Sequence, residues 1–171
     1  MARKSAIDMI VRENTNPCRR KNIRTVENRL LCEYYWDLVN RGVRGTIYAE
    51  VPVNPSYKND IMFGSILTKR VDAIFIPGFE KIEIIRFKRS SNSLYEIIER
   101  EFFAEIEGQD ITLIEVKKKL NFTAIGQVLA YAVLVKKSYH PNEIQKLIIC
   151  HEKDQDLLST LEKYGIELLE L

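Results

Sequence analysis

Two charged residues, Glu115 and Lys117, stand at the end of a stretch whose pattern is otherwise that of a buried strand, residues 111–117. Side chains alternate in direction along a strand, so both charged residues continue an apolar face formed by Ile111 and Leu113. Taking an ionisable group out of water is costly unless the group is paired or binds a metal ion. The pattern therefore has two interpretations: a solvated strand end, or a chemical site that contains a carboxylate and an ammonium group.

Another carboxylate interrupts an apolar stretch earlier in the chain. Residues 71–76 predict a short buried strand that Pro77 and Gly78 would end, and Asp72 is the one polar residue in it. Aspartate is disfavoured in strands and costly to bury, so Asp72 needs either a partner or a role. On its own, such an aspartate can be purely structural.

A helix ahead of these strands carries a third carboxylate. Thr25 is a suitable N-cap, the helical spacing of apolar residues continues to about Asn40, and Gly42 follows as a stop signal. Glu27, in the first turn, lies on the stripe expected to face the core, whereas Glu33 is nearer the flank. Glu27 either compensates the helix dipole or belongs to the site.

The segments between these elements are less regular. Residues 46–53 predict a strand, and residues 57–69 predict an irregular segment. The region 80–110 combines the pattern of an exposed strand, 81–88, with that of an amphipathic helix, 93–107. We interpret this region as an insertion that acts as a lid or a subunit contact.

A helix that is apolar nearly all round follows the Glu115 strand. Asn121 or Thr123 can cap it, it runs to about Lys137, and its composition predicts burial on more than one side. Gln127 and Tyr131 are four residues apart and share a face near its N-terminal half. They are either a part-exposed glutamine beside a core tyrosine, or contacts to a substrate.

The C-terminal part predicts a strand at 147–151, a helix from Asp154 through Tyr164, and a short strand at 166–169. The alternation of strands and helices along the whole chain indicates an α/β domain with a mixed sheet.

Charge is distributed unevenly along the 171 residues. Residues 1–24 contain seven Lys or Arg against two acidic residues, a net charge of +5, which leaves −3 for residues 25–171. The length and the 46% hydrophobic content fit one domain, 25–171, preceded by a basic arm, 1–24. The arm either contacts a polyanion or is a solvated terminus.

Three cysteines, Cys18, Cys32 and Cys150, are odd in number and far apart in sequence. This spacing argues against a disulfide framework and against a clustered zinc site, and predicts reduced thiols in a cytoplasmic protein. The longest apolar run is far shorter than a membrane span, so we expect no membrane association.

The sequence resembles the PD-(D/E)XK nuclease superfamily, whose pattern is an aspartate on one strand, Glu-x-Lys on the next and an apolar helix after it. Here the positions are Asp72, preceded by Val71 in place of the family's proline, and Glu115-Val116-Lys117. The resemblance implies an α/β, restriction-endonuclease-like fold with an αβββαβ core, in which helices flank a central mixed sheet.

Two further features resemble particular branches of that superfamily. The pair Gln127 and Tyr131 is similar to an extra motif of the RecB-like and Cas4-like branch. Glu27 is similar to the helix carboxylate of archaeal Holliday-junction resolvases. The cysteine cluster of the iron–sulfur members is missing from the sequence, so we expect no such cofactor.

The resemblance implies a metal-dependent deoxyribonuclease that uses Mg²⁺ or Mn²⁺. Phosphodiester hydrolysis needs charge neutralised at phosphorus and a nucleophilic water, and a divalent metal provides both. The implied ligands are oxygen donors: Asp72, Glu115, the Val116 carbonyl and, as a further candidate, Glu27. Lys117 would orient or help deprotonate the attacking water and stabilise the charged phosphate.

Other cationic or hydrogen-bonding side chains are candidates for DNA contacts: Gln127, Tyr131, Lys118, Lys119 and Arg70. The alternative function is a catalytically inactive, nuclease-like module that binds DNA or another protein. Members of the superfamily often act as dimers, so a homodimer is a further expectation, with residues 80–110 as a candidate contact.

Overall fold

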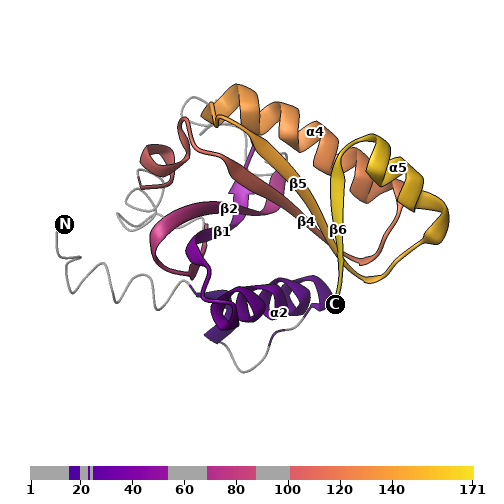
Figure 1. The fold of residues 1–171 in the computed structure, drawn as a ribbon, viewed down its shortest axis with the longest axis horizontal. Helices are drawn as coiled ribbons and strands as arrows, with labels where there is room; N and C mark the ends of the chain where they lie inside the picture. The colour runs from indigo at the N-terminus through magenta and orange to yellow at the C-terminus, as the bar shows by residue number, and fades with distance from the viewer. Residues whose placement is uncertain (1–15, 20–22, 24, 54–68, 88–100) are drawn as a thin grey trace, which may run out of the picture.

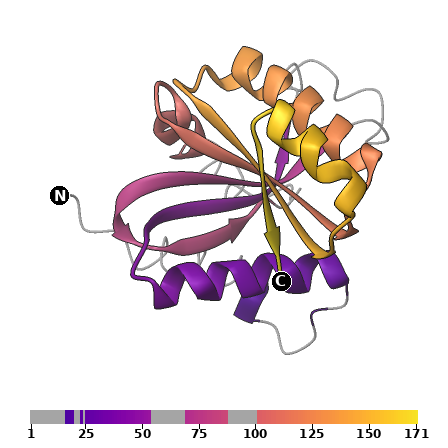
Figure 2. The ribbon, with the colours of Figure 1, turned by 45° about the vertical axis from the view of Figure 1, so that its right-hand side comes forward.

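The structure is a computed structural model that describes residues 16–19, 23, 25–53, 69–87 and 101–171. One mixed sheet of six strands, in the order β3-β1-β2-β4-β5-β6, forms its centre. Helix α2 lies along one face of this sheet, and α4 and α5 cover the other face (Figures 1 and 2). Each face buries its own apolar cluster, called here the α2-side cluster and the α4-side cluster.

Helix α2 (Val26–Asn40) follows its predicted bounds closely, because its first turn is capped locally. The side chain of Thr25 accepts a hydrogen bond from the Asn28 N–H, at 3.2 Å. Its buried residues form one stripe against the sheet: Leu30, Leu31, Cys32, Tyr34, Tyr35 and Leu38. This stripe anchors α2 through the α2-side cluster.

Strands β1 (Arg44–Pro52) and β2 (Arg70–Lys81) pair antiparallel. The prediction that Pro77 and Gly78 end the second strand is wrong, since β2 continues four residues beyond Pro77 to Lys81. The register between the strands shifts next to Gly45, which stands opposite Pro77. Gly45 permits this close approach, because a Cβ there would lie 2.4 Å from the Ile76 carbonyl oxygen.

The predicted insertion contributes to the sheet. Strand β3 (Glu83–Arg86) pairs parallel with β1, and Ile84 and Ile85 are buried, so the interpretation of 81–88 as an exposed strand is wrong. Residues 101–106 are helical. The rest of the predicted helix, 93–100, and nearly all of 57–69 lie outside the described residues.

Strand β4 (Ile111–Lys119) runs through the middle of the sheet, between β2 and β5 (Ile144–Glu152). Its side chains alternate as predicted. Leu113 belongs to the α4-side cluster and Ile114 to the α2-side cluster. The face that ends in Glu115 and Lys117 is therefore the one continuous with the α4 side.

Helix α4 (Phe122–Tyr139) begins at Asn121, whose side chain accepts a hydrogen bond from the Ala124 N–H at 2.8 Å. The prediction that it is buried on more than one side is wrong. The side chains of Phe122 and Val133 are 74% and 69% exposed, because no described element covers the outer face of this helix. No helix among the described residues is long and apolar enough to cross a membrane.

The remaining elements are η1 (Pro17–Arg19), η3 (Gln155–Leu157), α5 (Leu158–Lys163) and β6 (Ile166–Glu170). Strands β4, β5 and β6 are parallel, whereas β2 is antiparallel to both of its neighbours. The order α2-β1-β2-β4-α4-β5 confirms the predicted αβββαβ core and, with it, the restriction-endonuclease-like fold. Strand β3 is an addition to this core.

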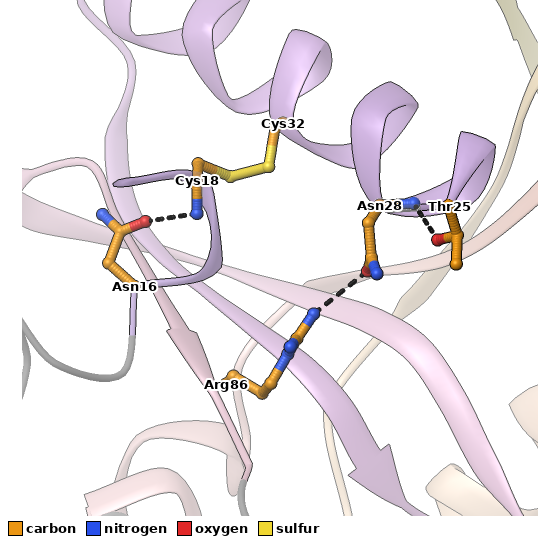
Figure 3. The surroundings of a disulfide bond; sticks show 6 residues. All are labelled: Asn16, Cys18, Thr25, Asn28, Cys32 and Arg86. Atoms are coloured by element: carbon orange, nitrogen blue, oxygen red, sulfur yellow. Dashed lines mark hydrogen bonds between the residues drawn. A yellow bond between two sulfur atoms is a disulfide. The ribbon is translucent and has the colours of Figure 1, made fainter. Parts of the chain in front are cut away.

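A disulfide bond joins Cys18 to Cys32, so the prediction of reduced thiols is wrong for this pair (Figure 3). The two cysteines are 14 residues apart in sequence, but the segment around η1 folds back against α2 and brings them together. Cys150 is a free thiol, buried in β5.

Candidate active site

The predicted strand-end carboxylates meet where β2 and β4 stop pairing. The last paired residues toward this end are Ala73 and Ile114. Beyond this pair, a side chain joins the two strands: the Val116 N–H of β4 donates a hydrogen bond to Asp72 Oδ2 of β2 at 2.8 Å. The two strands that the sequence left separated by a long insertion are therefore neighbours at the site.

Lys117 lies between the two carboxylates. Its Nζ is 2.6 Å from Glu115 Oε1 and 4.0 Å from Asp72 Oδ2. The side chain of Glu115 is only 1% exposed, compared with 26% for Lys117 and 38% for Asp72. The second oxygen of Glu115, Oε2, is buried and accepts no hydrogen bond from the described residues. This carboxylate keeps an unused acceptor inside the site.

The three groups perturb one another's protonation. Burial, and then the negative charge of Asp72, raise the pKa of Glu115 to about 7, against the opposing effect of Lys117. Burial also raises the pKa of Asp72, and the charges of Glu27 and Glu50 act in the same direction. The pKa of Lys117 is raised as well: burial lowers it, but the hydrogen bond and the charge of Glu115 outweigh burial. The site therefore combines two carboxyl groups of raised pKa with one lysine.

The raised pKa of Glu115 makes the stability of the metal-free protein depend on pH. Its pKa rises on folding from 4.5 to about 7, so the folded protein binds the proton more tightly than the unfolded chain. The resulting stabilisation is complete below pH 4.5 and is lost as the pH rises through about 7. We expect this carboxyl to lower the free energy of unfolding by about 2.5 kcal/mol between pH 5 and pH 8.

The measurement is urea unfolding in the presence of EDTA at both pH values. The variant Glu115→Gln removes the titrating group and keeps its shape, so it should show a flatter dependence on pH than the wild type. If the free energy of unfolding changed equally with pH in both proteins, the assignment of this pKa to Glu115 would be contradicted.

The site fits a divalent cation with few protein ligands. Within the described ranges, no group of three or more His, Cys, Asp or Glu lies close enough together to hold a metal ion. Asp72 and Glu115 form a pair, and Mg²⁺ in proteins is commonly bound by one or two carboxylates together with water and substrate phosphates. Such a cation would give the unused Oε2 of Glu115 a partner. Its positive charge would also lower the raised pKa of both acids.

Glu27, the further candidate ligand, is exposed, so the prediction that it faces the core is wrong. The buried stripe of α2 begins one turn later, at Leu30, and the first turn stays in contact with solvent. Glu27 is nevertheless close enough to Asp72 for its charge to raise the pKa of that carboxyl. Glu27 thus acts on Asp72 through its charge, and among the described residues it does not complete a three-carboxylate cluster.

The candidate substrate contacts from α4 lie toward Lys117. Gln127 Nε2 donates to the Tyr131 hydroxyl at 3.4 Å, and Gln127 Oε1 is buried without a partner among the described residues. Tyr131 is buried in the α4-side cluster. Lys118 and Lys119 are exposed at the end of β4.

Two residues near the site were missed by the sequence analysis, Glu50 and Arg86. Arg86 Nε lies 3.2 Å from Glu50 Oε1, and the predicted substrate residue Arg70 is 3.4 Å from Glu50 Oε2. The β1–β2 register places Glu50 opposite Asp72. A charged residue inside the strand pattern of 46–53 was the available signal, but its partners depend on strand register.

A comparison with solved structures finds a crystal structure of a repair endonuclease from Pyrococcus abyssi, with a TM-score of 0.46 and 18% identity. The match covers 85% of this chain and 45% of that chain, so this chain spans less than half the length of the endonuclease. No family model and no curated protein matches the chain. The fold assignment therefore rests on the element order and the sheet order described above.

Proposed function

We propose that this protein is a metal-dependent nuclease that hydrolyses DNA phosphodiester bonds. One observation carries the proposal: Asp72, Glu115 and Lys117 come from two strands and converge at the point where those strands diverge. An acid pair with an unused oxygen and an adjacent ammonium matches the needs of phosphodiester hydrolysis.

The donor atoms suit Mg²⁺ or Mn²⁺, both of which prefer oxygen ligands. Asp72, Glu115 and the Val116 carbonyl would hold the ion, which supplies charge neutralisation at phosphorus and a water that is nucleophilic near neutral pH. The Val116 N–H bond to Asp72 fixes one of these carboxylates against β4. Pre-positioning of this kind reduces the reorganisation needed when substrate binds.

Lys117 supplies the positive charge of the site. Its pKa is raised by the hydrogen bond and the charge of Glu115, which outweigh its burial, so it is protonated at neutral pH. A protonated lysine donates hydrogen bonds and does not accept a proton. Lys117 would therefore orient the attacking water and stabilise the charge on the phosphate, and it would not act as the general base.

DNA is the proposed substrate because of the resemblance and because exposed lysines follow the site residues along β4. Lys118 and Lys119 can contact phosphates, as can Arg70 once it exchanges its Glu50 partner for a phosphate. Gln127 and Tyr131 remain candidates for contacts close to the reacting group. The homodimer stays a prediction, and most of the basic arm, 1–24, lies outside the described residues.

The test is cleavage of labelled single-stranded, duplex and branched DNA with Mg²⁺ or Mn²⁺, with an EDTA control and an RNA of the same sequence. We expect cleavage that needs the metal. Asp72→Asn should weaken Mn²⁺ binding at least about tenfold, measured by electron paramagnetic resonance, because the pair loses one charged ligand. Asp110→Asn is the matched control, since Asp110 lies beside the opposite end of β4 and its Oδ1 accepts from Asn142 at 2.6 Å.

One observation favours the alternative, a nuclease-like module without catalysis. Lys117 Nζ is 2.6 Å from Glu115 Oε1, and such an ion pair can be purely structural. A protein of this kind would bind DNA in a salt-sensitive way, and binding would survive Asp72→Asn and Glu115→Gln. Metal-independent binding without cleavage would replace the nuclease proposal with this alternative.

A further inference from the structure

We infer that Glu50, Arg86 and Asn28 form a bridge that positions Glu27, and with it the charge of the first turn of α2, beside the Asp72–Glu115 pair. The inference rests on the proposed function. It makes Glu50, Arg86 and Asn28 positioning residues, which act on the metal site through α2 and do not touch the reacting atoms.

The backbone at Glu50 is the first observation. Its φ is +60°, in the left-handed region that residues with a Cβ rarely adopt. Among the described residues, the other non-glycine residue with positive φ is His140, which caps the C-terminus of α4. Glu50 lies inside a strand, so no helix cap explains its conformation. A strained residue persists only where its surroundings hold it, and such residues concentrate at functional sites.

This conformation changes the direction of the side chains along β1. Tyr48 belongs to the α4-side cluster and Ala49 to the α2-side cluster, so regular alternation would return residue 50 to the α4 side. Val51 lies in the α4-side cluster instead. Val71, paired with Val51, also lies in the α4-side cluster, and Ala73, paired with Ala49, in the α2-side cluster, so both strands change faces at the level of Glu50 and Asp72.

The contacts form a continuous path from β1 to α2. Arg86 Nε is 3.2 Å from Glu50 Oε1, in an ion pair that lacks hydrogen-bond geometry. Arg86 Nη2 donates to Asn28 Oδ1 at 3.1 Å (Figure 3). The side chain of Arg86 is 18% exposed, whereas that of Glu50 is 41% exposed, so Arg86 is the half-buried centre of the path and Glu50 its solvent-facing end. The Asn28 N–H also donates to the side chain of Thr25, the N-cap. The first turn of α2, which carries Glu27, is therefore held through both the backbone and the side chain of Asn28.

The bridge connects the first turn of α2 to the part of β1 that lies opposite Asp72. Glu50 stands opposite Asp72 in the β1–β2 register, and Glu27 directly precedes Asn28 in the chain. Arg86 joins Asn28 to Glu50, so side-chain contacts connect the first turn of α2 with the strand position opposite Asp72. A change in the length of the bridge would therefore alter the distance between the Glu27 charge and a cation that Asp72 and Glu115 would hold.

The test uses Arg86→Lys, which keeps the positive charge but removes the fork that reaches two partners at once. It is compared with Glu27→Gln and with the double variant. The readouts are Mn²⁺ affinity without DNA, by electron paramagnetic resonance, and the rate of DNA cleavage. We expect each single variant to weaken Mn²⁺ binding about threefold to tenfold, and the double variant to be no weaker than the weaker single variant.

Arg41→Lys is the matched control, because Arg41 Nη1 is 3.1 Å from Asp37 Oδ2 near the opposite end of α2. It should bind Mn²⁺ as the wild type does. If Arg86→Lys fails to fold by circular dichroism, Asn28→Ala breaks the other end of the bridge and should give the same loss. Multiplicative effects of Arg86→Lys and Glu27→Gln, or no effect of the bridge variants, would overturn the inference.

The two proposals fail in different ways. A wild type that binds Mn²⁺ but cleaves no DNA contradicts the nuclease proposal, while the non-additive Mn²⁺ affinities would still support the bridge. A wild type that cleaves DNA and shows multiplicative effects contradicts the bridge alone. A wild type that neither binds Mn²⁺ nor cleaves DNA overturns both.

Discussion

Replacing Lys117 with methionine should lower the rate of DNA cleavage by about 10²- to 10³-fold, the range for removal of a charge-stabilising donor. Lys117 Nζ contacts Glu115 and lies 4.0 Å from Asp72, so it is the cation closest to the proposed reacting centre among the described residues. Methionine has a similar length but cannot donate a hydrogen bond or carry charge. We therefore expect the loss in kcat, with a smaller change in KM for DNA.

Lys117→Arg is the informative companion. It keeps the charge, but a planar guanidinium cannot replace an ammonium held 2.6 Å from a buried carboxylate oxygen. We expect it to rescue little of the lost rate. Lys153→Met is the matched control, because Lys153 pairs with Glu170 at 2.8 Å on the far edge of the sheet. A rate for Lys117→Met equal to that of the wild type would show that the site lies elsewhere.

The folded state should survive the change at Lys117. Removing one member of a buried ion pair leaves an unpaired charge, which costs several kcal/mol if the other member stays ionised. Glu115 avoids this cost because its pKa, already about 7, would rise further and the carboxyl would take up a proton. The thermal midpoint of Lys117→Met should accordingly depend on pH more steeply than that of the wild type, with the greatest loss at alkaline pH.

Local patterns explain why much of the site could be predicted from the sequence. The two helix caps, Thr25 and Asn121, act on N–H groups three residues away, so their signals are contained in short segments. Side-chain alternation likewise places Glu115 and Lys117 on one face of β4. Asp72 joins them because β2 and β4 are neighbours, a relation that the resemblance supplied and that local patterns do not contain.

The features that were missed depend on contacts between distant segments. Glu50 adopts its left-handed conformation in a strand, and its partners Arg70 and Arg86 are 20 and 36 residues away. The shift of register beside Gly45 lets β2 continue through Pro77 and Gly78, which look like a strand end in sequence. Each of these features depends on the pairing of β1 with its two neighbours, β2 and β3. The spacing of residues along the sequence does not show which strands pair.

Removing the Cys18–Cys32 disulfide should lower the free energy of unfolding by about 3 kcal/mol, the value expected for a closed loop of about 15 residues. The bond spans 14 residues and restricts the unfolded chain, so its loss acts mainly on the unfolded state. For a chain of this length the thermal midpoint should fall by roughly 6–12 °C. The measurement is scanning calorimetry with and without a phosphine reductant.

Cys18→Ser is the suitable variant, because Cys18 is half-buried whereas Cys32 is buried in α2. The reductant should lower the midpoint of the wild type and leave that of Cys18→Ser unchanged, which separates loss of the bond from any effect on the buried thiol of Cys150. An equal response of both proteins would contradict the bond as the source of the stability.

The disulfide and the Glu50–Arg86–Asn28 bridge both act on α2, but at different distances from the site. Cys32 lies one turn beyond Asn28, and the contact of Asn28 with Arg86 does not pass through the sulfur atoms (Figure 3). Below its unfolding transition, reduced protein should therefore keep a DNA cleavage rate within about threefold of the oxidised protein, a change of less than 1 kcal/mol. A large loss of rate on reduction would mean that the disulfide, and not the bridge, holds the first turn of α2 beside Asp72.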